Sequence, residues 1–120
     1  MSDRETVAVE ARNLIQKAER AFLGSLAVRE AETFPFVSLV LPGLDATGLP
    51  LLLLSDLSDH AKNLKANPKA SLLYDGTFGL KEPLTGPRLT LIGQASLADE
   101  AENRERYLTR FGPAIPVRGG

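Results

Sequence analysis

The sequence contains no cysteine and no tryptophan, and it has one histidine in 120 residues. Without cysteine, disulfides, zinc–thiolate sites, iron–sulfur clusters and a cysteine nucleophile are all excluded. Aromatic residues make up 6% of the chain, which is too few for a platform that stacks nucleic-acid bases. Neither charge is in excess, because 14 Lys and Arg residues oppose 15 Asp and Glu residues, so we expect no nucleic-acid partner.

Long apolar runs and the common nucleotide motifs are also missing. The longest apolar run, from Leu51 to Leu54, is far short of the roughly 20 residues that span a bilayer, so we expect no membrane partner. The N-terminal stretch MSDRETVAVEARNLI lacks the layout of a signal peptide, and we expect a cytoplasmic location. GxGxxG, GxxxxGK[ST] and GxSxG motifs are absent, and no residue is identifiable as a catalytic acid, base or metal ligand.

What remains is a chain with enough apolar residues, 43%, to form one core, and we expect a single domain over residues 1–120. Apolar residues at helical spacing predict an N-terminal helix over residues 4–22. A polar, charged stretch predicts a C-terminal helix over residues 99–110. Residues 111–120 are expected to form an irregular tail.

Residues 23–98 have the features of consecutive strands, with one short helix among them. The candidate strands are GSLAVRE, FPFVSLVLP, PLLLLSD, KASLLYD and PRLTLIGQASLAD. The short helix begins after Ser58, which is a good N-cap, and ends before Pro68. Most strands follow one another without an intervening helix. This order argues against a doubly wound parallel sheet and favours an antiparallel sheet or small barrel with helices on its rim.

The start of that short helix is a candidate phosphate site. The first amides of a helix have no backbone partners and carry a positive dipole, so they bind phosphate readily. Ser55 and Ser58 add hydroxyl donors, His60 adds a ring nitrogen, and Lys62 adds a positive charge. A capped surface helix with solvated charges explains the same residues, so both interpretations stay open at this point.

A family resemblance adds to this pattern. The array PFVSLVLPGLDATGLPLLLLSDLSDHAKNLKANPKASLLY, followed by GPRLTLIGQAS, resembles the FMN-binding split-barrel proteins related to pyridoxamine 5′-phosphate oxidase. It is most similar to the HugZ-like haem-utilisation branch, in which SDLSxHxxNLxxNPxASLL and PRLTLxG patterns are typical. The resemblance covers residues 23–110 and implies an α+β fold, mainly β, built as an antiparallel Greek-key split β-barrel with flanking helices.

The resemblance also implies a function. Such proteins form homodimers with FMN at the interface, so we expect an FMN-dependent oxidoreductase that passes electrons to a small molecule or O₂, with the flavin supplying the redox chemistry. The positions that match the cofactor site are Ser38, Val40, Ser55, Ser58, His60, Lys62 and Arg88. Asp59 and His60 stand where the oxidases carry an Arg-Lys pair, which argues against pyridoxamine phosphate oxidation.

Two alternatives belong to other functional classes. The first is a haem-binding or haem-degrading protein of the HugZ-like branch. In this alternative His60 could be an axial ligand to haem iron, but its place beside the helix start fits phosphate contact better. The second is a dimeric split-barrel binding module without catalysis. It is favoured by the acidic residues Asp56 and Asp59, which lie in the candidate phosphate site at the start of the short helix.

Overall fold

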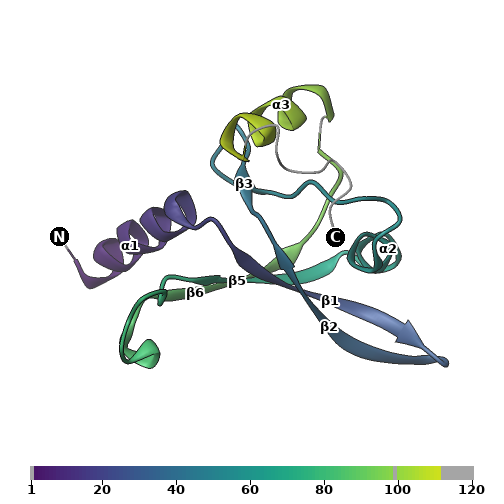
Figure 1. Cartoon of the computed structure of the whole chain (residues 1–120), viewed down its shortest axis with the longest axis horizontal. Coiled ribbons are helices and arrows are strands. Elements are labelled where there is room, and N and C mark those ends of the chain that lie inside the picture. The colour runs from purple at the N-terminus through teal and green to yellow at the C-terminus, as the bar shows by residue number, and fades with distance from the viewer. Residues whose placement is uncertain (1, 99, 112–120) are drawn as a thin grey trace.

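The computed structural model describes residues 2–98 and 100–111 (Figure 1). The elements in chain order are α1 (Asp3–Lys17), β1 (Ala21–Arg29), β2 (Glu32–Val40), β3 (Gly43–Leu44), β4 (Pro50–Leu51), α2 (Asp59–Ala66), β5 (Lys69–Asp75), a 3-10 turn (Pro83–Thr85), β6 (Arg88–Gln94) and α3 (Glu100–Phe111). The predicted tail lies, from residue 112 onward, outside the described residues.

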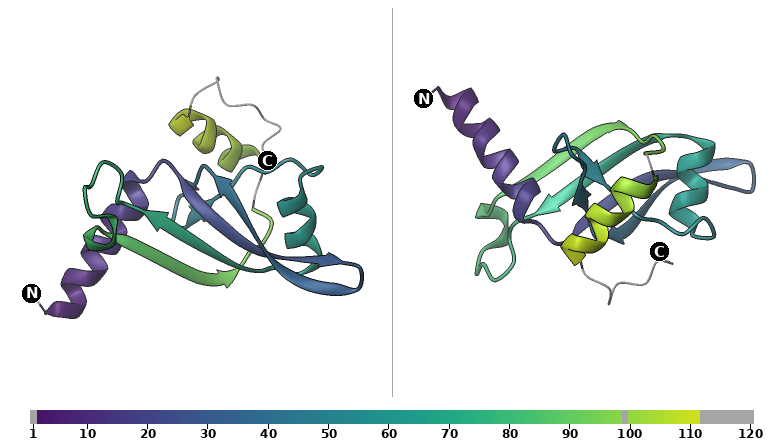
Figure 2. Two further views of the ribbon diagram at one scale, coloured as in Figure 1. Left: turned by 60° about the horizontal axis from the view of Figure 1, so that its bottom comes forward. Right: turned by 90° about the horizontal axis from the view of Figure 1, so that it is seen from above.

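The strands form two antiparallel sheets. The larger has four strands in the order β2-β1-β5-β6, and β3 pairs with β4 in a separate two-stranded ladder. Helix α1 lies at one end of the large sheet and α2 at the other (Figures 1 and 2). The mixed, mainly antiparallel α+β class is therefore as the sequence predicts, although the sheets do not close into a barrel within the described part of the chain.

The N-terminal helix ends at Lys17, so the predicted boundary at residue 22 is wrong. Ala18 already has an extended ψ of 128°, and its N–H bonds to the carbonyl of Leu14 as a cap. The chain then enters β1 at Ala21, which pairs with Val40 on one side and Tyr74 on the other. The apolar spacing continues past Lys17, but pairing on both sides of β1 outweighs it, since each paired residue satisfies backbone groups in the core.

The apolar run Leu51–Leu54 does not form the long strand predicted over 50–56. Only Pro50 and Leu51 pair, with Leu44 and Gly43. Leu51 is buried, and Leu52 and Leu54 pack against the main core, so this run contributes to the core of the domain. A continuous apolar run lacks the alternation that places one face of a strand in water, and here it lines the core as irregular chain.

The large sheet has one buried and one exposed face. Alternation along β1 and its partners sends Ala21, Leu23, Val40, Leu72 and Tyr74 inward, where Leu14 and Ile15 of α1 and Leu64 of α2 pack on them. Helix α3 contacts the chain just after β2, where the Tyr107 hydroxyl donates to the carbonyl of Leu41 at 2.7 Å. We call the opposite side of the sheet the outer face; its exposed apolar residues are Phe22, Val28, Val37, Leu39, Leu73 and Ile92.

The hairpin between β1 and β2 turns through two residues that both have positive φ, Glu30 at 52° and Ala31 at 66°. This is the conformation of a type I′ turn, which favours Asn or Gly because a Cβ is strained there. We expect Ala31→Gly to raise the free energy of unfolding by about 0.5–1 kcal/mol, measured by urea denaturation. The same change at Ala8, inside α1, should cost about 1 kcal/mol, and a loss of stability at position 31 would contradict the argument.

No helix within residues 2–98 and 100–111 combines the length and the apolar character that crossing a membrane requires. Location in the cytoplasm stays a prediction.

Candidate functional site

The two serines of the predicted phosphate site are brought together, and the oxygen of each hydroxyl takes part in a local hydrogen bond. Ser58 is the N-cap of α2, and its Oγ accepts from the N–H of Ala61 at 3.3 Å. The same hydroxyl donates to the carbonyl of Ser55 at 2.7 Å. The Oγ of Ser55 accepts from the N–H of Leu57 at 3.2 Å. The segment is thus a turn and a capped helix, the plainer of the two interpretations that the sequence allows.

His60 points into the protein instead of toward the helix start. Its side chain is only 3% exposed, and Nδ1 lies 2.9 Å from the Oγ of Ser38 on β2. Three residues further along α2, the amide of Asn63 donates to the Oγ of Ser25 on β1 at 3.2 Å. We call Ser25, Ser38, His60 and Asn63 the polar layer, because they fill the space between α2 and the inner face of the sheet. It forms because small serines under the helix leave room and supply partners for buried polar groups.

The electrostatics of the polar layer favour a neutral imidazole. Burial removes water from the ring and lowers the pKa of His60, while the nearby negative charge of Asp59 raises it to a smaller extent. The Nε2 atom is buried and has no hydrogen-bond partner among the described residues. A charged His60 would therefore lack both water and a full set of acceptors, and this ring is poorly placed to meet a ligand outside the helix.

The other predicted cofactor residues do not gather around α2. Val40 is a core residue that pairs with Ala21. Lys62 is exposed on α2. Arg88 begins β6, the edge strand opposite to β2, and its guanidinium donates to the carbonyl of Leu84 at 3.0 Å. Arg88 and the Ser38–His60 pair therefore lie on opposite edges of the sheet, and FMN contact by this set of residues stays a prediction.

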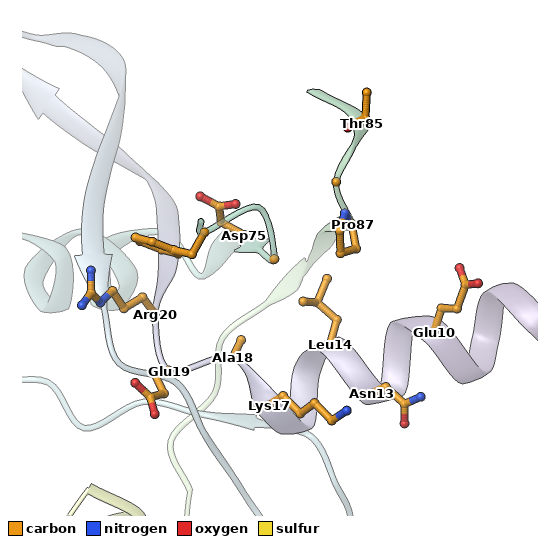
Figure 3. A pocket seen from close by; sticks show the side chains of 13 residues that line it. Glu10, Asn13, Leu14, Lys17, Ala18, Glu19, Arg20, Asp75, Thr85 and Pro87 are labelled. Atoms are coloured by element: carbon orange, nitrogen blue, oxygen red, sulfur yellow. The ribbon is translucent and has the colours of Figure 1, made fainter. Parts of the chain in front are cut away.

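A cavity lies at the other end of the sheet, between α1 and the loop that joins β5 to β6. Its volume is about 860 Å³. Leu14 projects from α1 toward Pro87, and Arg20 and Asp75 lie farther along the same opening (Figure 3). Gly76 makes this packing possible, since a Cβ there would lie 2.9 Å from both the Leu14 side chain and the carbonyl oxygen of Pro87.

A second cavity of about 510 Å³ lies on the other side of the α1–β1 linker, against α3. It is lined by three cations, Lys17, Arg20 and Arg110, and by one carboxylate, Glu19. Arg110 is fixed in place, because its Nη2 donates to the carbonyls of Gln16 and Ala18 at 2.8 and 2.9 Å. Lys17, Glu19 and Arg20 line both cavities, so the linker is the wall between them.

Arg20 is the residue of this region that the sequence did not single out. Its guanidinium lies 5.0 Å from the centre of the Phe78 ring, a cation–π contact across a large separation in sequence. It stands in the linker between a helix and a strand, where no motif or periodicity marks it. Only the return of the β5–β6 loop to the end of α1 brings the ring to the cation.

The described residues offer little for a metal ion, since they contain no group of three or more His, Asp or Glu side chains placed to share one. Both cavities, by contrast, combine apolar and cationic surface, which fits an organic ligand that carries an anionic group.

Comparison with known proteins identifies the relatives of the chain. A family model for the CREG β-barrel matches residues 2–112. The chain is 41% identical over 92 residues to the chloroplastic haem oxygenase HOZ of Arabidopsis thaliana, a match that covers 74% of this chain and 28% of that protein. The chain thus spans little more than a quarter of this curated relative.

Solved structures agree on the fold. One structure, 34% identical, superposes with a TM-score of 0.77 and is matched over 91% of this chain and 72% of its own. A haem-binding protein from Mycobacterium smegmatis is 30% identical, with a TM-score of 0.71 over 88% of this chain and 46% of that one. The split-barrel resemblance predicted from the sequence is confirmed at the level of fold and family.

Proposed function

Since the chain belongs to the CREG β-barrel family, we propose that it is a haem-binding domain of the HugZ-like branch. The observation that carries this proposal is the 41% identity to a haem oxygenase over 74% of the chain. The likeness to a haem-binding protein at 30% identity supports the same ligand. Of the functions considered from the sequence, the haem alternative is therefore favoured over FMN.

The residues present fit a haem better than a flavin phosphate. A haem has a flat apolar body and two carboxylates, so it needs apolar surface beside cations. The cavities around the α1–β1 linker offer apolar surface at Leu14, Phe78 and Pro87 and cations at Arg20 and Arg110, beside the carboxylates Glu10, Glu19 and Asp75. The hydroxyls at the start of α2, in contrast, are held in turn and cap bonds. When bound, haem iron supplies one-electron and O₂ chemistry.

His60 is not placed as a ligand to the iron in this proposal. Its Nδ1 is held by Ser38, and its Nε2 is enclosed beneath α2. The ring would have to leave the polar layer to reach an external metal, which would break its contact with Ser38. The domain's own contribution is to bind and orient the macrocycle.

We also propose that two copies pair through the outer face. Its apolar residues are exposed on the middle and edge strands of one sheet, and contiguous apolar surface of this kind marks an interaction site. A second copy is the occupant that the family resemblance implies, and symmetric pairing would bury the same residues from both chains.

A haem titration followed by absorbance tests the proposed function. We expect a Soret band at one haem per chain, retained in His60→Gln, because His60 stays in the polar layer and does not bind iron. FMN added to the same protein, followed by quenching of flavin fluorescence, should give no uptake. FMN uptake without a haem spectrum would overturn the proposal and favour the FMN-dependent oxidoreductase predicted from the sequence. A Soret band lost in a folded His60→Gln variant would show that the histidine is a ligand.

A further inference from the structure

The turn before α2 and the helix itself form one internally bonded stretch, residues 55–66, which we call the α2 segment. The hydroxyl of Ser58 caps the helix and donates to the carbonyl of Ser55. The ammonium group of Lys65 donates to the carboxylate of Asp56 at 2.8 Å. Each of these bonds joins two residues of the segment. They would therefore persist if the segment moved away from the sheet as a unit.

The attachment of the α2 segment to the sheet is largely polar. Two of the three buried residues of α2, His60 and Asn63, are polar, and the third is Ala61. Within the described residues, polar contacts with the β1–β2 hairpin are His60 with Ser38 at 2.9 Å, Asn63 with Ser25 at 3.2 Å and Asp59 with Arg29 at 3.9 Å. The last pair is exposed and contributes little, so the polar layer is the specific connection.

The polar layer accommodates His60 only as a neutral ring. The side chain is 3% exposed, and Nε2 has no hydrogen-bond partner within the described part of the chain. Protonation would make donors of both ring nitrogens, while Ser38 lies against Nδ1 alone. The second N–H and the positive charge would then be buried without an acceptor, which is costly unless water reaches the ring. Separation of the α2 segment from the hairpin would supply that water.

The charged groups of the surrounding elements do not offset this cost. They are Asp59, Lys62 and Lys65 on α2, Asp56 in the preceding turn, Arg29 on β1 and Glu32 on β2, and all of them are exposed. Exposed charges act on a buried ring through water and are screened by salt. Burial lowers the pKa of His60 by more than the neighbouring carboxylate of Asp59 raises it.

We propose that the α2 segment is an acid-sensitive cover, which protonation of His60 releases from the β1–β2 hairpin while the rest of the sheet stays paired. The hairpin projects past β5 at this end (Figures 1 and 2), because β1 pairs with β5 only from Ala21 to Gly24. Release would expose the inner face of the hairpin and leave the pairing around Ala21 and Tyr74 in place. The proposal does not depend on haem binding.

Because the sequence has no cysteine, one introduced thiol can report this opening. Ala27 is 2% exposed on the inner face of β1, between Ser25 and Arg29, whose side chains both contact α2. Ala21 is 0% exposed on the same face at the other end of the strand, so Ala21→Cys is the matched control for Ala27→Cys. Alkylation by iodoacetamide is followed from about pH 7.5 to about pH 5.5, and each rate is divided by that of the same thiol in urea.

We expect normalised labelling of Ala27→Cys to rise by up to about tenfold per pH unit below about pH 6.5, because the open segment binds the proton that the closed one excludes. Ala21→Cys should be labelled more slowly at every pH, and adding His60→Gln to Ala27→Cys should remove the rise. Equal labelling of the two thiols at every pH would overturn the proposal, because α2 would then separate only when the whole domain unfolds. A rise that survives His60→Gln would overturn it as well.

Hydrogen exchange of the wild type makes the same distinction without a substitution in the core. After correction for intrinsic exchange rates, the amides of α2 should be less protected than those of β5 at every pH. Their protection should fall with pH in the wild type and in Lys62→Gln, which changes an exposed charge of the same helix, but not in His60→Gln. Equal protection of α2 and β5, or the same fall in His60→Gln, would refute the acid-sensitive cover.

Discussion

Acidification of the wild-type protein below about pH 6.5 is expected to lower its free energy of unfolding, by up to about 1.4 kcal/mol per pH unit. The cause is His60, whose ring is 3% exposed and held between α2 and β2 by its contact with Ser38. Burial lowers the pKa of His60 below its ordinary value in the folded protein. The unfolded chain therefore takes up a proton on this ring at a higher pH than the folded chain does.

The sign follows from that difference. Above the unfolded pKa the ring is neutral in both states, and the full stability is present. As the pH falls between the unfolded and the folded pKa, the unfolded state binds more protons and stability is lost. The carboxyls of Asp45, Asp56 and Asp75 have lowered pKa values for a different reason, hydrogen bonds to Thr47, Lys65 and Thr77, so their contribution is lost only below about pH 3.8.

Urea denaturation at fixed protein concentration, from about pH 7.5 to about pH 5, measures the effect above the carboxyl range. His60→Gln is the comparison, because an amide keeps a polar side chain near Ser38 and does not titrate. We expect a falling unfolding free energy for the wild type and a nearly flat one for the variant. Parallel slopes for the two proteins would show that His60 is not the group that titrates.

Introducing a charge on the outer face is expected to convert the proposed dimer into monomers. Val37 lies on β2 with 68% of its surface exposed, next to Leu39 two positions along the strand. Burying a valine against a partner contributes about 1.5 kcal/mol, and a symmetric interface contains it twice. Val37→Asp would remove both contributions and place two carboxylates in apolar surface, so the dissociation constant should rise at least about 100-fold.

Sedimentation velocity across a range of protein concentrations tests this expectation. Leu57→Asp is the matched control, since Leu57 is 78% exposed in the turn before α2 and is not part of the outer face. We expect dimers for the wild type and for Leu57→Asp, and monomers for a folded Val37→Asp. A wild type that is monomeric throughout the range, or a Val37→Asp variant that stays dimeric, would refute pairing through this face.

Local signals were enough to locate most of the elements. Ser58 and Pro68 marked the start and the end of α2, which spans Asp59–Ala66. The pattern KASLLYD appears as β5 over the predicted residues 69–75. The strand predicted over 87–99 is shorter in the structure, since β6 ends at Gln94 and residues 95–98 are not part of a strand. Boundaries failed where tertiary pairing competes with periodicity, as at the end of α1, where the apolar spacing continues but the chain leaves the helix to pair with β2 and β5.

The candidate site was harder to derive from sequence. The resemblance identified the split-barrel fold, and the family that matches is the CREG β-barrel; the HugZ-like branch and FMN binding stay predictions. Ser38 and His60, which the resemblance grouped, are in contact. Their contact is a buried bond under a helix, because the direction of the His60 ring depends on the small serines of two strands that α2 covers.

The sequence by itself determined the class of the protein: an α+β chain with hairpins, a capped short helix and the family pattern, all of which are encoded by residues close together in the chain. Tertiary structure alone decided which side chains share a space. It enclosed His60, left one face of the sheet apolar and exposed, and brought Arg20, Phe78 and Arg110 together at the α1–β1 linker. Contacts between distant segments depend on how strands pair and helices pack, and a local sequence pattern does not predict them.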